Sequence, residues 1–288
     1  MFIIIGLVVV FGSILLGYTM HHGHIQVLMQ VSEFIIIGGA GIGSMLVGNP
    51  PSVVTAVFKQ CIALLKGNPY KKSIFSELLL MLFELFQTAR RDGMLALEPH
   101  VERPHESTIF NKYPFFVHNH HATAMLSDTL KVLLTGSVDR NDLAEILELD
   151  LERHHEEAMT VSEVLAVTAD AMPGFGIVAA VLGIVITMGS IGGAASEIGQ
   201  KVAAALVGTF IGILLAYGVF QPLAHAARSV AIGESAYLGC IKTALLSFAR
   251  GDQPITSAEF ARRNIEPGCR PSFSEMEELI RNWKGSAS

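Results

Sequence analysis

Charged residues are absent from two long stretches in the second half of this chain. Residues 171–196 contain no Asp, Glu, Lys or Arg, and residues 202–227 contain none either. Only the five residues 197–201 separate the two stretches. Each stretch exceeds the roughly 20 apolar residues that a helix needs to cross a bilayer. The pattern therefore predicts a pair of membrane-spanning helices joined by a short turn.

Two more spans are predicted near the N-terminus. Residues 2–20 carry no charge, and a second apolar run covers residues 34–47. Asn49-Pro50-Pro51 then breaks the helix, because proline lacks the backbone N–H that a helix interior uses. The first run has no basic segment before it and no small-residue cleavage site after it, so we interpret it as a span and not as a signal peptide.

The remaining segments have helical patterns. Residues 76–86 form a strong helical run that is expected to end near Gly93, and apolar residues recur at helical spacing between Asn141 and Asp170. No helix breaker precedes Pro173, so one long helix should continue into the third span. Residues 272–275 match a capping box that starts a final helix. No strand-like alternation is present, and the predicted fold class is an all-α integral membrane protein.

The distribution of Lys and Arg orients the predicted spans. The loop at 21–33 has none and the loop at 197–201 has one, whereas residues 51–170 have eleven and the tail after 227 has eight. Positive residues accumulate on the cytoplasmic side of a membrane. The expected order is span 1–20, periplasmic loop 21–33, span 34–50, cytoplasmic helical domain 51–170, span 171–196, periplasmic loop 197–201, span 202–227 and cytoplasmic tail 228–288.

The composition agrees with a membrane protein and excludes some partners. The chain has 288 residues, of which 51% are hydrophobic and 16% are charged, and its mean hydropathy is +0.48. Soluble domains are nearer a quarter charged. The net charge of −6 argues against nucleic acid as a partner. Cys61, Cys240 and Cys269 lie far apart without a CxxC pair, as expected for free thiols in a reducing compartment.

The chain lacks the motifs of an enzyme or a metal site. Histidines cluster at residues 21–24, 118–121 and 154–157, but none forms HExxH, and adjacent histidines on a helix point to different faces. We therefore predict surface histidines, no metal and no cofactor; a histidine-dependent metal transporter or membrane enzyme is the disfavoured alternative. No phosphate-binding or nucleophile motif occurs, and the glycines of residues 38–43 suit close helix packing.

The predicted pair of spans, 171–196 and 202–227, contains residues that suggest ion conduction. Pro173 should kink its helix, and Pro173, Ala180 and Thr187 share a helical face because they are seven residues apart. The other span contains Thr209 and ends at Pro222. Since the spans are antiparallel, both prolines are expected near the cytosolic end, at one depth, where they could form a hinge. The alternative is that proline and glycine serve only packing here, as in many membrane helices.

A proton path needs a group within the membrane that binds and releases protons. The predicted spans supply no carboxylate, since Glu33 is placed at the outer mouth, and His225 lies at the cytosolic edge. Proton conduction would therefore require a carrier from another protein, and hence a hetero-oligomer.

A second constellation of charges follows the helix at 76–92. It comprises Arg90, Arg91, Asp92 and Glu98. Such mixed charges form either a solvated face or an electrostatic docking site for a protein partner, where complementary charge gives steering and specificity.

These residues resemble a known family. The chain is similar, over nearly its whole length, to MotA stator subunits of the bacterial flagellar motor, within the wider MotA/TolQ/ExbB proton-channel group. The matching segments are residues 39–44, 90–98, 173–181, 207–218, Pro222 and residues 270–273.

The resemblance implies an assembly in the bacterial inner membrane. Five such subunits would surround a dimer of a single-span MotB-like partner, which brings a protonatable Asp and a peptidoglycan-anchoring domain. Arg90 and Glu98 match residues that contact the rotor protein FliG. The chain would be a stator subunit and not an enzyme; the alternative is an ExbB/TolQ-type energiser of outer-membrane processes.

The resemblance also implies roles within the channel. Pro173 and Pro222 match prolines that couple ion passage to movement. The position of Ala180 is typically Thr in sodium-driven relatives, so Ala180 indicates protons. Thr209 occurs in both types, and together with Thr187 it completes the face that would meet the partner's Asp.

Overall fold

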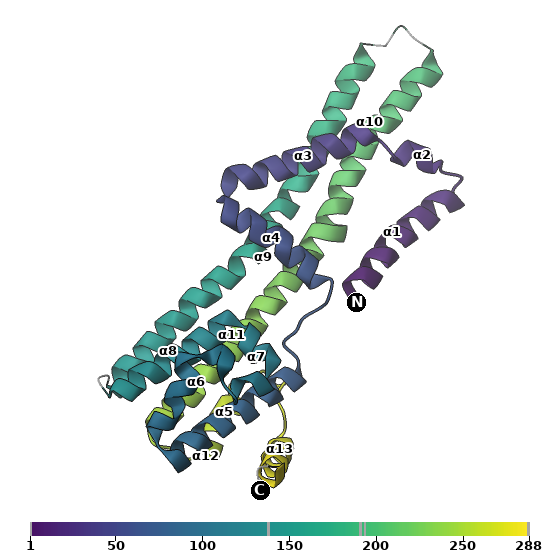
Figure 1. The fold of residues 1–288 in the computed structure, drawn as a ribbon. Coiled ribbons are helices and arrows are strands. Elements are labelled where there is room, and N and C mark those ends of the chain that lie inside the picture. Colours follow the sequence, from purple (N-terminus) through teal and green to yellow (C-terminus); the bar gives the residue numbers. More distant parts are fainter. Residues whose placement is uncertain (1, 137–138, 190–191, 193, 287–288) are drawn as a thin grey trace. The chain divides into compact units, whose positions relative to one another are not determined.

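The computed structural model describes residues 2–136, 139–189, 192 and 194–286, and every regular element in these residues is a helix (Figure 1). The all-α prediction is confirmed. The α-helices are α1 Phe2–Met20, α2 Ile25–Leu28, α3 Val31–Gly48, α4 Pro51–Leu64, α5 Lys72–Asp92, α6 Glu98–Glu102, α7 Pro114–His118, α8 His120–Thr135, α9 Arg140–Met188, α10 Ala195–Leu215, α11 Gln221–Ala249, α12 Pro254–Arg263 and α13 Phe273–Ser286. Short turns of 3-10 helix are Met94–Leu97, Pro104–Glu106 and Phe110–Lys112, and a π-helical turn covers Ala216–Phe220.

Four helical segments are long and apolar enough to cross a membrane, as predicted. They are Phe2–Met20, Ile25–Gly48, Asn141–Met188 and Ala195–Ala249. The chain is therefore a multi-pass membrane protein. The predicted long helix is also confirmed, because α9 runs for 49 residues and contains Pro173 in its interior. Which residues lie in the bilayer, and which side each loop faces, stay predictions.

The turn predicted at residues 197–201 is helical in the structure. α10 begins at Ala195, and Glu197 pairs with Lys201 at 3.1 Å. Charges of opposite sign four residues apart stabilise a helix, most favourably with the acid on the N-terminal side. The two charges that interrupt the apolar pattern therefore support the first turns of α10.

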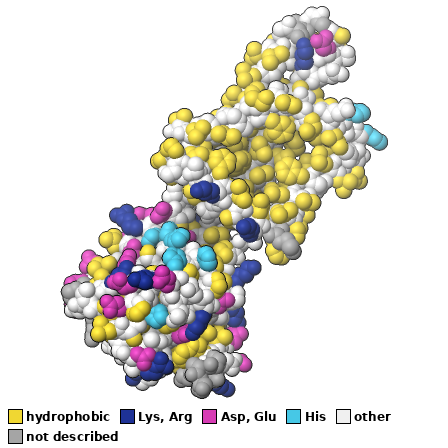
Figure 2. Space-filling model, viewed as in Figure 1, with side chains coloured by type: hydrophobic (Ala, Val, Ile, Leu, Met, Phe, Trp, Pro, Cys, Tyr) yellow, Lys and Arg dark blue, Asp and Glu magenta, His cyan; other side chains and the backbone are white. Residues whose placement is uncertain are grey.

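The chain divides into two compact units. We call Met1–Gly67 with Ala158–Ser229 the apolar unit, and Asn68–Glu157 with Val230–Ser288 the charged unit. Hydrophobic side chains cover most of the visible face of the apolar unit, whereas acidic, basic and histidine side chains crowd the charged unit (Figure 2). α9 and α11 contribute residues to both units.

The core of the charged unit forms around α5. Its apolar face is fully buried, and Phe86 stacks on Phe248 of α11 with ring centroids 4.3 Å apart. α5 ends where predicted, because Gly93 adopts a φ of 91° that side chains disfavour. The predicted capping box is present at α13: Glu275 N donates to Ser272 Oγ at 3.2 Å, and Ser272 N donates to Glu275 Oε2 at 2.6 Å.

Candidate functional site

Within the apolar unit, α9 and α10 cross with their backbones in contact. A Cβ added to Gly176 would lie 2.9 Å from the carbonyl oxygen of Gly208 and 3.2 Å from Cα of Gly212. A Cβ added to Gly212 would lie 2.7 Å from the carbonyl oxygen of Met172. Since real Cβ atoms do not come so close to backbone, only glycine permits this crossing. The glycines of the two spans therefore set how closely the helices approach.

The crossing brings two of the predicted channel residues together. A Cβ on Gly208 would lie 3.3 Å from the backbone N of Ala180, and a Cβ on Gly176 would lie 3.3 Å from the Cα of Thr209. Ala180 is buried and Thr209 is half-buried. Thr187 lies about 10 Å further along α9, given a rise of 1.5 Å per residue. Its buried hydroxyl donates to the carbonyl oxygen of Gly183 at 2.8 Å, so it serves its own helix.

The two prolines do not lie at one depth, contrary to the prediction. Met172, next to Pro173, packs its carbonyl oxygen against Gly212 of α10. Ten residues, about 15 Å of helix, separate Gly212 from Pro222. Consistent with this register, Ser162 Oγ donates to the carbonyl oxygen of Ala224 at 2.9 Å, well away from Pro173. An antiparallel arrangement does not equalise depth, because the glycine contacts set the offset between the two helices.

An irregular turn, which the sequence pattern did not predict, precedes Pro222. Residues Ala216–Phe220 form a π-helical turn between α10 and α11. Such turns are rare and occur often at functional sites. Pro222 cannot donate a backbone hydrogen bond, which leaves a carbonyl of the preceding turn without its usual partner. In the sequence, the glycine at 218 followed by the proline at 222 was the signal that could have indicated an irregular turn here.

A carboxyl group lies buried inside the apolar unit, that of Glu33, which the sequence placed at the outer mouth of the spans. α3 begins at Val31, which places Glu33 in its first turn and within the candidate span Ile25–Gly48. Glu33 is only 5% exposed, and its Oε2 atom has no hydrogen-bond partner. Oε2 lies 2.5 Å from where a Cβ of Gly208 would stand, and Ala179 and Ala180 border the same point. The oxygen therefore fills space that is free only because Gly208 has no side chain.

In the charged unit, Arg90 and Glu98 differ from the neighbouring Arg91 and Asp92, which form an ion pair with each other. Arg91 donates two hydrogen bonds to Asp92 at 2.8 and 2.9 Å, and these bonds hold the pKa of the Asp92 carboxyl below its ordinary value. Arg90 and Glu98 are exposed, and neither has an ion-pair partner within the described ranges. Gly93 and the turn Met94–Leu97 separate them. Two unpaired charges of opposite sign are thus presented to solvent.

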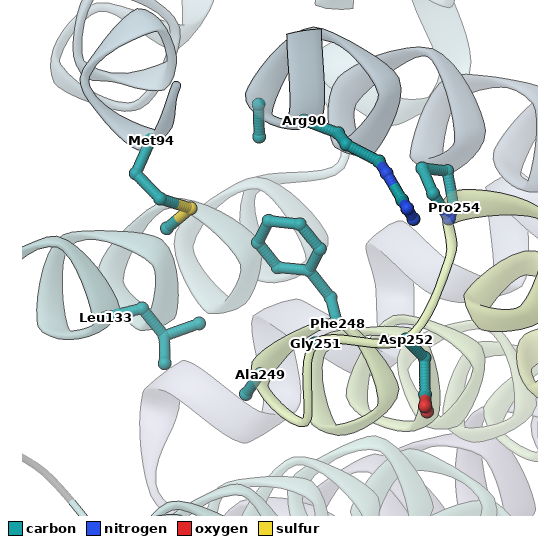
Figure 3. A pocket seen from close by; sticks show the side chains of 9 residues that line it. Arg90, Met94, Leu133, Phe248, Ala249, Gly251, Asp252 and Pro254 are labelled. Carbon is teal, nitrogen blue, oxygen red and sulfur yellow. The ribbon is translucent and has the colours of Figure 1, made fainter. Parts of the chain in front are cut away.

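A pocket of about 360 Å³ lies beside Arg90 (Figure 3). The guanidinium extends toward Pro254, the ring of Phe248 stands in the middle, and Met94 and Leu133 border the other side (Figure 3). The site therefore combines a cation with an apolar hollow, which suits a protein surface with an acidic group next to an apolar side chain.

Two of the histidine clusters, which the sequence predicted to be surface histidines, meet in the structure. The rings of His121 and His154 are 4.5 Å apart, His121 Nδ1 lies 3.7 Å from Glu234, and His154 Nε2 lies 3.4 Å from Asp150. Helix packing within the charged unit brings these residues together. No group of three or more His, Cys, Asp or Glu in the described part of the chain is arranged to hold a metal ion.

Comparisons with known proteins agree with this architecture. The family "Motility protein A N-terminal" matches residues 4–93, and the "MotA/TolQ/ExbB proton channel family" matches residues 117–236. Motility protein A of Salmonella typhimurium is 38% identical over 281 residues, 98% of this chain and 95% of that protein. Motility protein A of Escherichia coli is 38% identical over 99% of this chain and 96% of its own length. Chemotaxis protein LafT of Vibrio parahaemolyticus is 36% identical, covering 97% and 96%.

Two solved structures share the fold. The MotAB structure from C. jejuni aligns with a TM-score of 0.76 at 21% identity, covering 94% of this chain and 98% of that one. The flagellar MotAB stator complex from Bacillus subtilis aligns with a TM-score of 0.66 at 21% identity, covering 89% and 92%. The helical architecture is therefore one that has been solved in other proteins.

Proposed function

This chain belongs to the MotA/TolQ/ExbB proton channel family, and on that premise we propose that it is a stator subunit of the bacterial flagellar motor that couples proton flow to torque. The observation that carries the proposal is the near full-length identity of 38% to two proteins named Motility protein A. The match of the motility-specific N-terminal family to residues 4–93 favours the motor over an ExbB/TolQ-type energiser.

The proposed assembly contains a second protein. Similar folds occur in structures of MotAB complexes, so we assign this chain a MotB-like single-span partner in the bacterial inner membrane, with five copies of the chain around a partner dimer. The apolar unit supports an assembly of this kind, because it exposes many large hydrophobic side chains that lipid, neighbouring copies or the partner would cover.

The proposed mechanism starts at the partner's Asp. A proton from outside neutralises it, which removes the cost of a charge in apolar surroundings. Contacts with the face that bears Ala180 and Thr209 then change, and the helices adjust. Pro173 and the π-helical turn before Pro222 are the irregular points where α9 and α10 can bend. One charge crossing 100 mV supplies about 2.3 kcal/mol, so each proton can drive only a small step.

The proposed output is a push on the rotor protein FliG by Arg90 and Glu98. Both charges are exposed and unpaired, whereas Arg91 and Asp92 already neutralise each other. A rotor surface of complementary charge would meet Arg90 and Glu98 without first breaking an internal ion pair. Complementary charges favour rapid and specific association over tight binding, which suits a contact that forms and breaks at every step.

Swimming of a flagellated strain that lacks its own A-type stator subunit tests the function. The chain and its cognate partner would be supplied together, and external sodium would be varied at fixed pH. Swimming that ignores sodium and stops with a proton uncoupler is expected. A swimming speed that rises and falls with external sodium would overturn the inference of proton selectivity from Ala180, but it would leave the assignment as a motor subunit intact. No swimming, with both proteins in the membrane, would favour the energiser.

A further inference from the structure

The buried carboxyl group of Glu33 has an oxygen atom, Oε2, without a hydrogen-bond partner among the described residues. The side chain makes no hydrogen bond in the described structure, and Oε2 is shielded from solvent. An acidic residue in the first turn of a helix is usually stabilised by backbone N–H groups, but no such bond holds Glu33. The carboxyl group therefore calls for a reason other than folding.

Among the residues that the structure describes, no cation forms an ion pair with Glu33. On α10, the nearest charged residue to Gly208 is Lys201, seven residues or about 10 Å away along the helix, and it pairs with Glu197. On α9, the nearest to Ala179 is Asp170, nine residues or about 14 Å away. α1 and α2 contain no charged residue, and α3 contains no other. The exposed His21, His22 and His24 lie in the segment between α1 and α2 or at the start of α2.

The position of Glu33 is suited to proton transfer. Gly208 stands about 9 Å inside the predicted span 202–227, counted from its outer end. The carboxyl oxygen is thus level with Ala180 and Thr209, the residues expected to face the partner's Asp. Ionisable residues within membrane spans are costly and, where they occur, mark ion or proton paths. Gly208 contributes by lacking a Cβ, which would strike the oxygen.

We propose that Glu33 is a second proton-binding group of the path, which receives protons from the outer side and passes them to the partner's carboxylate. The inference rests on the proposed function. In the transfer, one carboxyl oxygen forms an O–H bond with a proton released by an outer hydronium ion, and the O–H bond on the other oxygen breaks. The released proton goes to the partner's carboxylate, directly or through water, and Glu33 regains its starting charge.

The test compares Glu33→Gln with Glu33→Asp in the complete complex. Gln keeps the shape and polarity of Glu but cannot exchange a proton in this way, whereas Asp can. Rotation of single motors would be measured at low load, which demands the fastest proton transit, over a range of external pH. We expect E33Q to lower the speed at least threefold and to flatten its dependence on pH, and E33D to retain at least half of the speed.

Other outcomes would overturn the inference. If motors with E33Q turn at the wild-type speed at every external pH, Glu33 carries no protons. If motors with E33Q turn and motors with Glu33→Ala do not, the side chain only fills space or accepts a hydrogen bond. A wild-type complex that turns no motor counts against the proposed function instead. Should E33Q fail to reach the membrane, infrared spectra of the wild-type complex with ¹³C-labelled glutamate decide, because a relay requires a labelled carboxylic-acid band that fades as external pH rises.

Discussion

Replacing Gly176 by alanine should separate α9 from α10. The added Cβ would lie 2.9 Å from the carbonyl oxygen of Gly208, where ordinary contact begins at 3.4 Å, so the helices must part by about 0.5 Å. The obstacle is backbone on α10, including the Cα atoms of Thr209 and Gly212, and backbone cannot rotate aside. Overpacking of this kind costs about 1–3 kcal/mol.

Gly174 provides the matched control. It lies two residues away on the same helix, and nothing stands within 4 Å of a Cβ added there. Alanine is about 1 kcal/mol more favourable than glycine within a helix, so Gly174→Ala should leave stability unchanged or raise it. The two substitutions make the same chemical change, but only Gly176→Ala is expected to lower the stability of the complex.

Thermal unfolding of the purified complex, together with swimming speed, measures the difference. We expect G176A to lower Tm by several degrees and to slow swimming, because the crossing that carries Ala180 and Thr209 is displaced. Equal Tm values for G176A and G174A would refute the close packing of α9 on α10. A G176A complex that is destabilised but swims normally would separate the packing from the coupling.

Further predictions concern Arg90, Pro173 and Glu275. Arg90→Glu should reduce single-motor torque more than Arg91→Glu, because Arg91 is already engaged with the carboxylate of the next residue; equal losses would argue against a role for unpaired charge. Pro173→Leu should reduce both torque and ion flow, and normal values of both would contradict the coupling scheme. The hydrogen bond from Lys72, with those from Ser272, lowers the pKa of Glu275 to about 2. Since the folded state holds this pKa below its unfolded value of about 4.3, the contribution of Glu275 is complete above that pH and is lost as pH falls toward 2. The difference in Tm between the wild type and Glu275→Gln should shrink over that window.

The sequence by itself determined the elements of this protein. Uncharged apolar runs predict the four spans, helical periodicity predicts α5 and the continuation of α9 through Pro173, and the spacing of Ser272 and Glu275 predicts the cap of α13. These features depend on residues within a few turns of one another. Side-chain periodicity and local capping hydrogen bonds are therefore enough to predict them from the sequence.

Only the tertiary structure decided which residues meet. The register of α9 on α10 separates the two prolines in depth, and the same crossing buries the carboxyl group of Glu33 against Gly208. In the charged unit, helix packing joins the distant histidines His121 and His154. These outcomes follow from how closely particular glycines and side chains on separate helices can approach. Such contacts are set by the packing of surfaces far apart in the chain, which a linear pattern does not contain.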